Sequence, residues 1–267
     1  MRASEPVDRA ALARHVAAAV REAGALALKS FKTPVKSWFK HGGSPVSDAD
    51  LAVDAFLRER LDGAGLPCAW VSEESENDPA RLAAERVWIV DPIDGTRAFL
   101  AGLPDWSVSV ALTQAGRPIV GAVYAPVTDE LFLATAGGGA TQNGRPMAVA
   151  DGPALAGARA AGPERRLARL AGLGLVAEPK VHSLALRIAW VAQGRLDIAL
   201  VGPEGCDWDL AAADLLVHEA GGVLTTLAGA TLIYNRASLT HGALLAAGRA
   251  RHRALSELMR EGKVAFR

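Results

Sequence analysis

The sequence predicts a mixed α/β protein built from an α+β N-terminal half and an α/β C-terminal half. Three observations support this prediction. Helical patterns precede a series of strand patterns in residues 1–150, whereas strand and helix patterns alternate in residues 151–267. Residues 151–157 contain two glycines and one proline, which is typical of a boundary. Half of the 267 residues are hydrophobic, so the chain can bury a substantial core.

The N-terminal half begins with two amphipathic helical patterns. Residues 6–31 are rich in alanine, and their larger apolar residues recur near one face. A second helix is predicted at residues 50–61, and either Ser47 or Asp48 could cap its start. The segment between the helices, residues 36–45, is basic and contains glycine, which predicts a loop or a short hairpin.

Two adjacent glutamates, Glu73 and Glu74, follow a short strand predicted at residues 69–71. A solvated turn that continues into a polar helix at residues 78–86 is the simplest explanation. In the alternative, this strand lies beside the one that ends at Asp91, so that the carboxylates of both strand ends converge. The residues alone leave both explanations open.

Residues 88–100 combine a strand, a tight turn and a short helix. Asp91 ends the apolar strand. The following Pro92 has a fixed φ angle and favours an extended backbone at Asp91. Asp94 occupies the position of an N-cap for a helix at residues 96–100. A helix N-terminus suits a phosphate group, and paired carboxylates suit Mg²⁺. Asp-Pro and Asp-Gly pairs are also ordinary turn signals, so this stretch alone could be a plain loop.

The remaining elements are predicted from shorter patterns. Two strands around a Gly-Arg-Pro turn predict a hairpin. The helix near residue 215 begins with acidic residues and ends at Gly-Gly. In chain order, we expect strands at 106–113, 119–124, 130–134 and 147–149, helices at 164–170 and 184–193, a strand at 198–201, a helix at 210–220, strands at 223–225 and 243–246, and a helix at 249–261.

Composition excludes several classes of function. The chain has 29 basic and 29 acidic residues, so its net charge gives no reason to expect binding to nucleic acid or to an anionic membrane. No apolar stretch reaches the length of a membrane span, so we expect no membrane insertion. The two cysteines, Cys68 and Cys206, form no metal-ligand pattern and favour a reducing compartment, the cytoplasm.

Four motifs in a fixed order resemble the inositol monophosphatase superfamily. They are Pro45-Val46-Ser47-Asp48-Ala49-Asp50, Glu73-Glu74-Ser75, Asp91-Pro92-Ile93-Asp94-Gly95-Thr96, and Trp208-Asp209-Leu210-Ala211-Ala212 followed by Glu219-Ala220-Gly221-Gly222. The resemblance implies a layered αβαβα sandwich, shared with fructose-1,6-bisphosphatase, and Mg²⁺-dependent hydrolysis of a small phosphate ester. It also implies that residues 1–150 carry most metal ligands, and that residues 151–267 carry Asp209 and substrate contacts.

The resemblance also implies a role for each motif residue. The metal ligands would be Glu73, Asp91, the Ile93 carbonyl, Asp94 and Asp209, while Glu74 would support a third metal ion. Gly95 and Thr96 would hold the phosphate through their amides, and Asp50 with Thr96 would orient the attacking water. Phosphate monoesters hydrolyse very slowly without a catalyst, and two or three Mg²⁺ ions can stabilise the developing charge. Inhibition by Li⁺ and a homodimer are further family-level expectations.

Three basic residues bear on the substrate. Arg97 follows the Asp-Gly-Thr triplet, and Arg187 follows Leu186 where bacterial 3′(2′),5′-bisphosphate nucleotidases of the CysQ type tend to have Leu-Lys. Arg187 and Lys40 are candidates to bind a second phosphate group, and Arg97 is a candidate substrate contact. We therefore expect adenosine 3′,5′-bisphosphate as the substrate, although Leu184-Ala185 replace the serines of those nucleotidases. The alternatives are inositol-1-monophosphatase, histidinol-phosphatase and an inactive metal- or phosphate-binding homologue.

Overall fold

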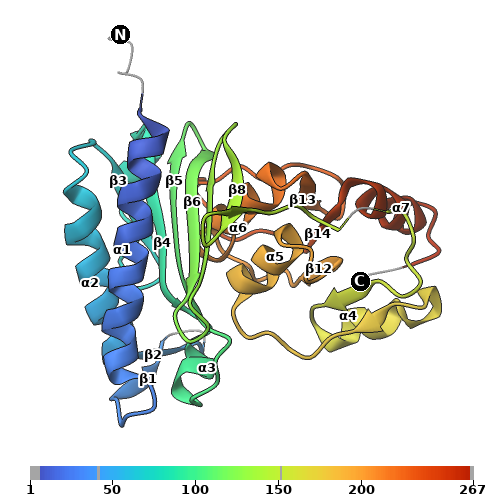
Figure 1. Cartoon of the computed structure of the whole chain (residues 1–267), viewed down its shortest axis with the longest axis horizontal. Coiled ribbons are helices and arrows are strands. Elements are labelled where there is room, and N and C mark those ends of the chain that lie inside the picture. Colours follow the sequence, from blue (N-terminus) through green and yellow to red (C-terminus); the bar gives the residue numbers. More distant parts are fainter. Residues whose placement is uncertain (1–6, 41–42, 151, 265–267) are drawn as a thin grey trace.

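The computed structural model describes residues 7–40, 43–150 and 152–264, and it shows five alternating layers of helix and sheet (Figure 1). α1 (Arg9–Ser30) and α2 (Asp48–Asp62) cover one face of a seven-stranded sheet. α5 (Leu184–Ala192) and α6 (Asp207–Glu219) cover its other face and also pack against a five-stranded sheet. α7 (Arg249–Arg260) lies on the far side of that second sheet. The predicted layered α/β fold is confirmed.

The larger sheet carries most of the predicted motifs. β4 lies inside it and all nine of its residues are buried, because helices cover both faces of the sheet. β3 and β4 are parallel, and the remaining neighbours are antiparallel. The strand order is β3 (Ala69–Ser72), β4 (Arg86–Asp94), β5 (Ser107–Gln114), β6 (Arg117–Ala125), β7 (Glu130–Thr135), β8 (Gly139–Gln142) and β9 (Arg145–Pro146).

The parallel pairing of β3 and β4 decides between the two explanations for the adjacent glutamates. Ser72 is in register with Val90, and the Glu73 amide donates a hydrogen bond to the Val90 carbonyl at 3.3 Å. The chain therefore leaves both strands at the same edge of the sheet, so that Glu73 follows β3 beside Asp91 of β4. The carboxylates converge, as the second explanation requires.

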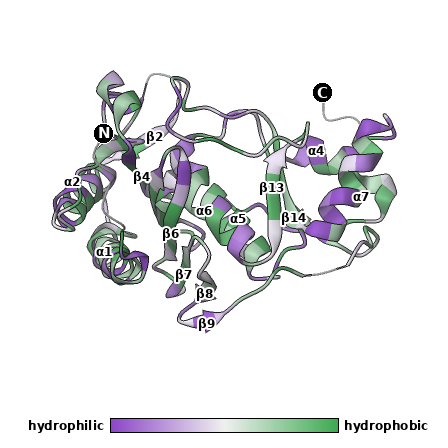
Figure 2. Cartoon of the chain, turned by 90° about the horizontal axis from the view of Figure 1, so that it is seen from above, coloured by the Kyte–Doolittle hydropathy of each residue, from purple (hydrophilic) through white to green (hydrophobic). Residues whose placement is uncertain are grey.

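The smaller sheet is mixed and belongs to residues 159–248. α5 and α6 lie between its strands and those of the larger sheet (Figure 2). Its strand order is β11 (Val176–Ala177), β10 (Arg159–Ala161), β12 (Ile198–Val201), β14 (Leu244–Gly248) and β13 (Gly222–Thr226). Short elements complete the chain: β1 (Ser37–Phe39), β2 (Pro45–Ser47), η1 (Pro79–Ala83), α3 (Thr96–Leu100), α4 (Glu164–Arg169) and η2 (Ala171–Leu173).

Two predicted elements are wrong. The helix expected at residues 78–86 is only the 3₁₀ turn η1, because Arg86 already belongs to β4. The strand expected at residues 147–149 does not form, because this segment leaves the sheet. The Met147 amide still bonds to Ala140, whereas the Val149 amide bonds to Ala220 at the end of α6.

Other predictions hold within the described residues. β1 and β2 form the short antiparallel hairpin that residues 36–45 allowed, although residues 41–42 lie outside the described part. Residue 6 of the first predicted helix and residue 151 of the predicted boundary also lie outside it. The division at residue 150 stays a prediction. Within the described ranges, no helix is both long enough and apolar enough to cross a membrane.

Candidate active site

The predicted acidic motifs line one cavity of about 340 Å³, which we term the acidic pocket. Its walls come from the end of β4, the turn after β3, the start of α3 and the first turn of α6, together with the segment that precedes α5. The predicted site residues that line it are Glu73, Asp91, Asp94, Gly95, Thr96, Arg97 and Asp209.

Three aspartates form the centre of the acidic pocket. Asp91, Asp94 and Asp209 each offer a carboxylate oxygen within 4.8 Å of the other two. Asp91 Oδ1 accepts a hydrogen bond from the Ile93 amide at 3.1 Å, but its buried Oδ2 has no partner among the described residues. A buried carboxylate oxygen without a partner is costly, so it indicates a ligand position for a cation.

The electrostatics of the three aspartates lead to the same conclusion. Burial raises the pKa of Asp91 and Asp209 well above its usual value, and the neighbouring carboxylates raise it further. Burial also raises the pKa of Asp94 to about 6, although hydrogen bonds to its carboxylate oppose the shift. A bound divalent cation would offset this repulsion, and an all-oxygen donor set suits Mg²⁺.

Glu73 and Glu74 are both bound by Lys40. Lys40 Nζ lies 2.8 Å from Glu73 Oε1 and 2.8 Å from Glu74 Oε1. Burial raises the pKa of Glu74 to about 7 in spite of this lysine. Ser72 stabilises this turn, because its hydroxyl donates a hydrogen bond to the Asp54 carboxylate and accepts one from the Glu74 amide. Lys40 is therefore paired with the two glutamates, and it does not line the acidic pocket in which it was predicted to contact substrate.

The two residues predicted to orient water are in contact. Thr96 Oγ1 lies 3.2 Å from Asp50 Oδ1 and 3.1 Å from the Ile93 carbonyl oxygen. Asp50 Oδ2 accepts hydrogen bonds from the Ser47 amide and hydroxyl, as part of the capping box of α2. Asp50 is thus buried and fixed, and burial raises its pKa.

Asp94 does not cap α3 as predicted. Gly95 is the N-cap, with a φ of +93° that a side chain would strain. This left-handed residue turns the chain, and Asp94 instead binds the start of α5 in the other half of the molecule. Its carboxylate accepts hydrogen bonds from Ser183 Oγ at 2.6 Å, the Leu184 amide at 3.1 Å and the Ala185 amide at 2.7 Å.

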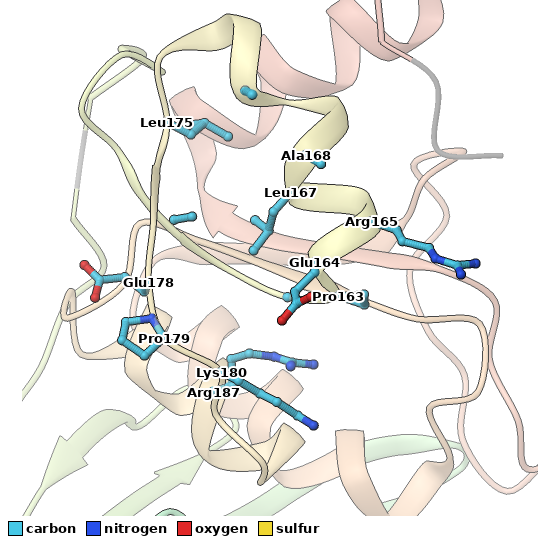
Figure 3. A pocket seen from close by; sticks show the side chains of 13 residues that line it. Pro163, Glu164, Arg165, Leu167, Ala168, Leu175, Glu178, Pro179, Lys180 and Arg187 are labelled. Carbon is cyan, nitrogen blue, oxygen red and sulfur yellow. The ribbon is translucent and has the colours of Figure 1, made fainter.

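Of the three basic residues predicted to contact substrate, only Arg97 lines the acidic pocket, where it is exposed. Arg187 lines a second cavity of about 880 Å³, which we term the large pocket (Figure 3). Its Nε atom is buried without a hydrogen-bond partner among the described residues. Burial lowers the pKa of Arg187, and the charges of Asp94 and Asp209 oppose that shift.

Sequence reasoning missed two basic residues that line the cavities, Lys180 and His182. Lys180 lines both pockets, and Figure 3 shows its side chain extending along the large pocket in the same direction as that of Arg187. His182 lines the acidic pocket, and its Nδ1 lies 2.7 Å from Asp105 Oδ2. The only available signal was position, because both basic residues directly precede the predicted helix at residues 184–193.

Comparisons with known proteins identify relatives of this arrangement. The sequence model of the inositol monophosphatase family matches residues 5–262. The inositol-1-monophosphatase of Rhizobium meliloti is 36% identical over 200 residues, covering 69% of this chain and 73% of the relative. The histidinol-phosphatase of Mycobacterium tuberculosis is 37% identical over 199 residues, covering 70% and 75%. The crystal structure of the suhB protein from Bartonella henselae superposes with a TM-score of 0.82 at 27% identity, covering 94% and 99%.

Proposed function

We propose that this chain, which belongs to the inositol monophosphatase family of phosphatases, hydrolyses a small phosphate monoester with Mg²⁺ held in the acidic pocket. The observation that carries the proposal is the convergence of Asp91, Asp94 and Asp209, with Asp91 Oδ2 lacking a partner among the described residues. Glu73 and the Ile93 carbonyl complete the proposed ligand set, and Glu74 would support a further ion. When bound, Mg²⁺ would neutralise charge on the phosphate and lower the pKa of coordinated water.

The residues of the chain itself would bind the phosphate and position the water. The backbone amides of Gly95 and Thr96 lie at the start of α3, where unpaired N–H groups favour an anion. Asp50 and Thr96 are hydrogen-bonded to each other beside the carboxylates, so they can orient a water molecule for attack on phosphorus. Asp50, whose pKa is raised by burial, is suited to accept the proton of that water.

For the substrate, we propose a compound that carries a second anionic group, with adenosine 3′,5′-bisphosphate first. Lys180 and Arg187 line the large pocket, and Lys180 also lines the acidic pocket, so an anion beyond the reacting phosphate would meet two cations. The other walls of the large pocket include the apolar residues Leu167, Ala168 and Leu175, which suit a flat apolar group. Histidinol phosphate would bring a cationic amine to the same cations, and inositol 1-phosphate would bring no second charge.

Phosphate release with and without Mg²⁺ tests the proposed reaction. We expect purified protein to release phosphate from a simple monoester in the presence of Mg²⁺, and EDTA to abolish the release until excess Mg²⁺ is added. Undiminished turnover in thoroughly chelated protein would contradict a metal-dependent mechanism.

A substrate panel tests the specificity separately. Values of kcat/KM for adenosine 3′,5′-bisphosphate, inositol 1-phosphate and histidinol phosphate should be highest for the bisphosphate. A preference for inositol 1-phosphate or histidinol phosphate would assign the enzyme the activity of one of its named relatives and leave the proposed reaction intact.

A further inference from the structure

A histidine–carboxylate pair faces the acidic pocket and has no role in the mechanism described above. His182 lines the pocket, and Asp105 Oδ2 accepts two hydrogen bonds from it, one from Nδ1 and one from the backbone amide, both at 2.7 Å. Because Asp105 occupies Nδ1, the ring atom left for a ligand is Nε2. The carboxylate therefore selects the protonated form of Nδ1 and fixes the plane of the ring.

Several hydrogen bonds hold the backbone around His182. The Ser183 amide donates to the Asp105 carbonyl at 3.1 Å, and Ser183 Oγ lies 2.9 Å from Ser107 Oγ. Ser183 Oγ also donates to Asp94, one of the three clustered aspartates. The imidazole is thus positioned relative to Asp94 by a short chain of hydrogen bonds, as precise acid–base chemistry requires.

His182 and the two residues proposed to orient the attacking water come from different halves of the molecule. Asp50 and Thr96 belong to α2 and α3 in the N-terminal half, whereas His182 precedes α5. In an in-line displacement, the attacking and leaving oxygens lie on opposite sides of phosphorus. Thr96 and His182 line the same cavity of about 340 Å³, and the proposal requires that a phosphate bound near Thr96 directs its leaving oxygen toward His182.

We propose that His182, oriented by Asp105, is the general acid that protonates the leaving oxygen. The inference rests on the proposed phosphatase reaction. The oxygen of water forms a bond to phosphorus, and Asp50 takes its proton. The ester P–O bond breaks with its electron pair on the leaving oxygen, which takes the proton from Nε2. Solvent then returns a proton to Nε2 and removes one from Asp50, so the cycle balances.

Leaving groups of different basicity test the proposal. Glycerol 2-phosphate releases a basic alkoxide that needs a proton, whereas 4-nitrophenyl phosphate releases a stabilised phenolate that does not. At saturating Mg²⁺, we expect His182→Ala to lower kcat/KM on glycerol 2-phosphate by about 100-fold or more, and on 4-nitrophenyl phosphate by less than about threefold. His182→Gln, which keeps a hydrogen-bond donor but cannot transfer a proton, should give the same pattern.

Two further variants complete the experiment. Asp105→Asn should produce a smaller loss with the same dependence on the leaving group, because the amide orients His182 without stabilising its cation. Arg14→Ala, an exposed position on α1, is the matched control and should change neither value. Activity on 4-nitrophenyl phosphate also shows that each variant is folded.

The outcomes separate the inference from the function on which it rests. Equal losses on both substrates, or no loss on either, would overturn the role of His182 while leaving the phosphatase in place. A wild-type protein that hydrolyses neither of these esters nor adenosine 3′,5′-bisphosphate in the presence of Mg²⁺ would overturn the proposed function and the inference together.

Discussion

The acidic pocket and the large pocket share Lys180, but the chain builds them in different ways. The acidic pocket takes its carboxylates from strand ends and a helix start, where short motifs of Asp, Glu, Gly and Pro determine the backbone. The large pocket takes its walls from α4, the segment around β11 and the side of α5, where the sequence motifs singled out Arg187 alone. The comparison indicates that local sequence places the carboxylates of the proposed reaction site, whereas the packing of distant elements shapes the cavity that we propose selects the substrate.

The largest effect is expected from a substitution in the acidic pocket itself. Asp91→Asn removes the central charge from the cluster and should lower kcat by about 1000-fold or more on every substrate, because several kcal/mol of charge stabilisation depend on the bound metal. The same change relieves repulsion among the carboxylates, so in EDTA the Tm should rise rather than fall. Steady-state kinetics and thermal unfolding measure the two effects, and a variant that keeps wild-type turnover would remove Asp91 from the ligand set.

A smaller effect is expected where the two halves of the molecule meet. Ser183→Ala removes the hydrogen bond from Ser183 Oγ to the Asp94 carboxylate and leaves Ser107 Oγ without its partner. A hydrogen bond to a charged group contributes about 1.5–3 kcal/mol, so the free energy of unfolding should fall by that amount in a urea titration. Activity should fall equally on bisphosphate and simple monoester, because Asp94 serves both. A loss confined to one substrate would place Ser183 in substrate recognition instead.

The smallest effect concerns pH. The folded-state pKa values of Asp94 (about 6) and Glu74 (about 7) exceed their ordinary values of 3.8 and 4.5, and those of Asp91 and Asp209 are raised as well. Between the ordinary and the raised pKa, the folded protein binds more protons than the unfolded chain, so its stability falls as pH rises. In EDTA, Tm should therefore be lower at pH 8 than at pH 5, by about 5 °C.

Mg²⁺ provides the control for this pH effect. His218, whose pKa is raised by its hydrogen bond to Asp214, changes stability in the same direction, so the pH dependence in EDTA is not specific to the pocket. A bound cation replaces the protons on the carboxylates, so added Mg²⁺ should raise Tm more at pH 8 than at pH 5. An equal rise of Tm at pH 8 and pH 5 would show that the clustered carboxylates do not bind the metal.

Sequence-based prediction succeeded where a pattern extends over several residues. The buried apolar run of β4, the capped start of α2 and the acidic first turn of α6 were predictable, because periodicity and end signals act over a few residues. β10 and β11, at two to three residues, carry too little pattern to recognise. The pairing of Asp105 with His182 joins residues 77 positions apart, so only the folded chain reveals it.

The capping role assigned to Asp94 shows the same limit in a single residue. Its position before Gly95 correctly indicated a turn, but the helix it binds lies about 90 residues further along the chain. Local sequence identified a carboxylate at a functional turn, whereas its partner depended on how the two halves pack.

The central claim, that one pocket performs the reaction and the other selects the substrate, is tested most directly by Arg187→Ala. At saturating Mg²⁺, kcat/KM should fall by about 10- to 100-fold on adenosine 3′,5′-bisphosphate, the amount expected for losing a charged hydrogen bond. On glycerol 2-phosphate, which has no second anionic group, it should stay within about threefold of wild type. Equal losses on both esters would show that Arg187 serves the carboxylates of the acidic pocket, and would contradict the separation of reaction and selection.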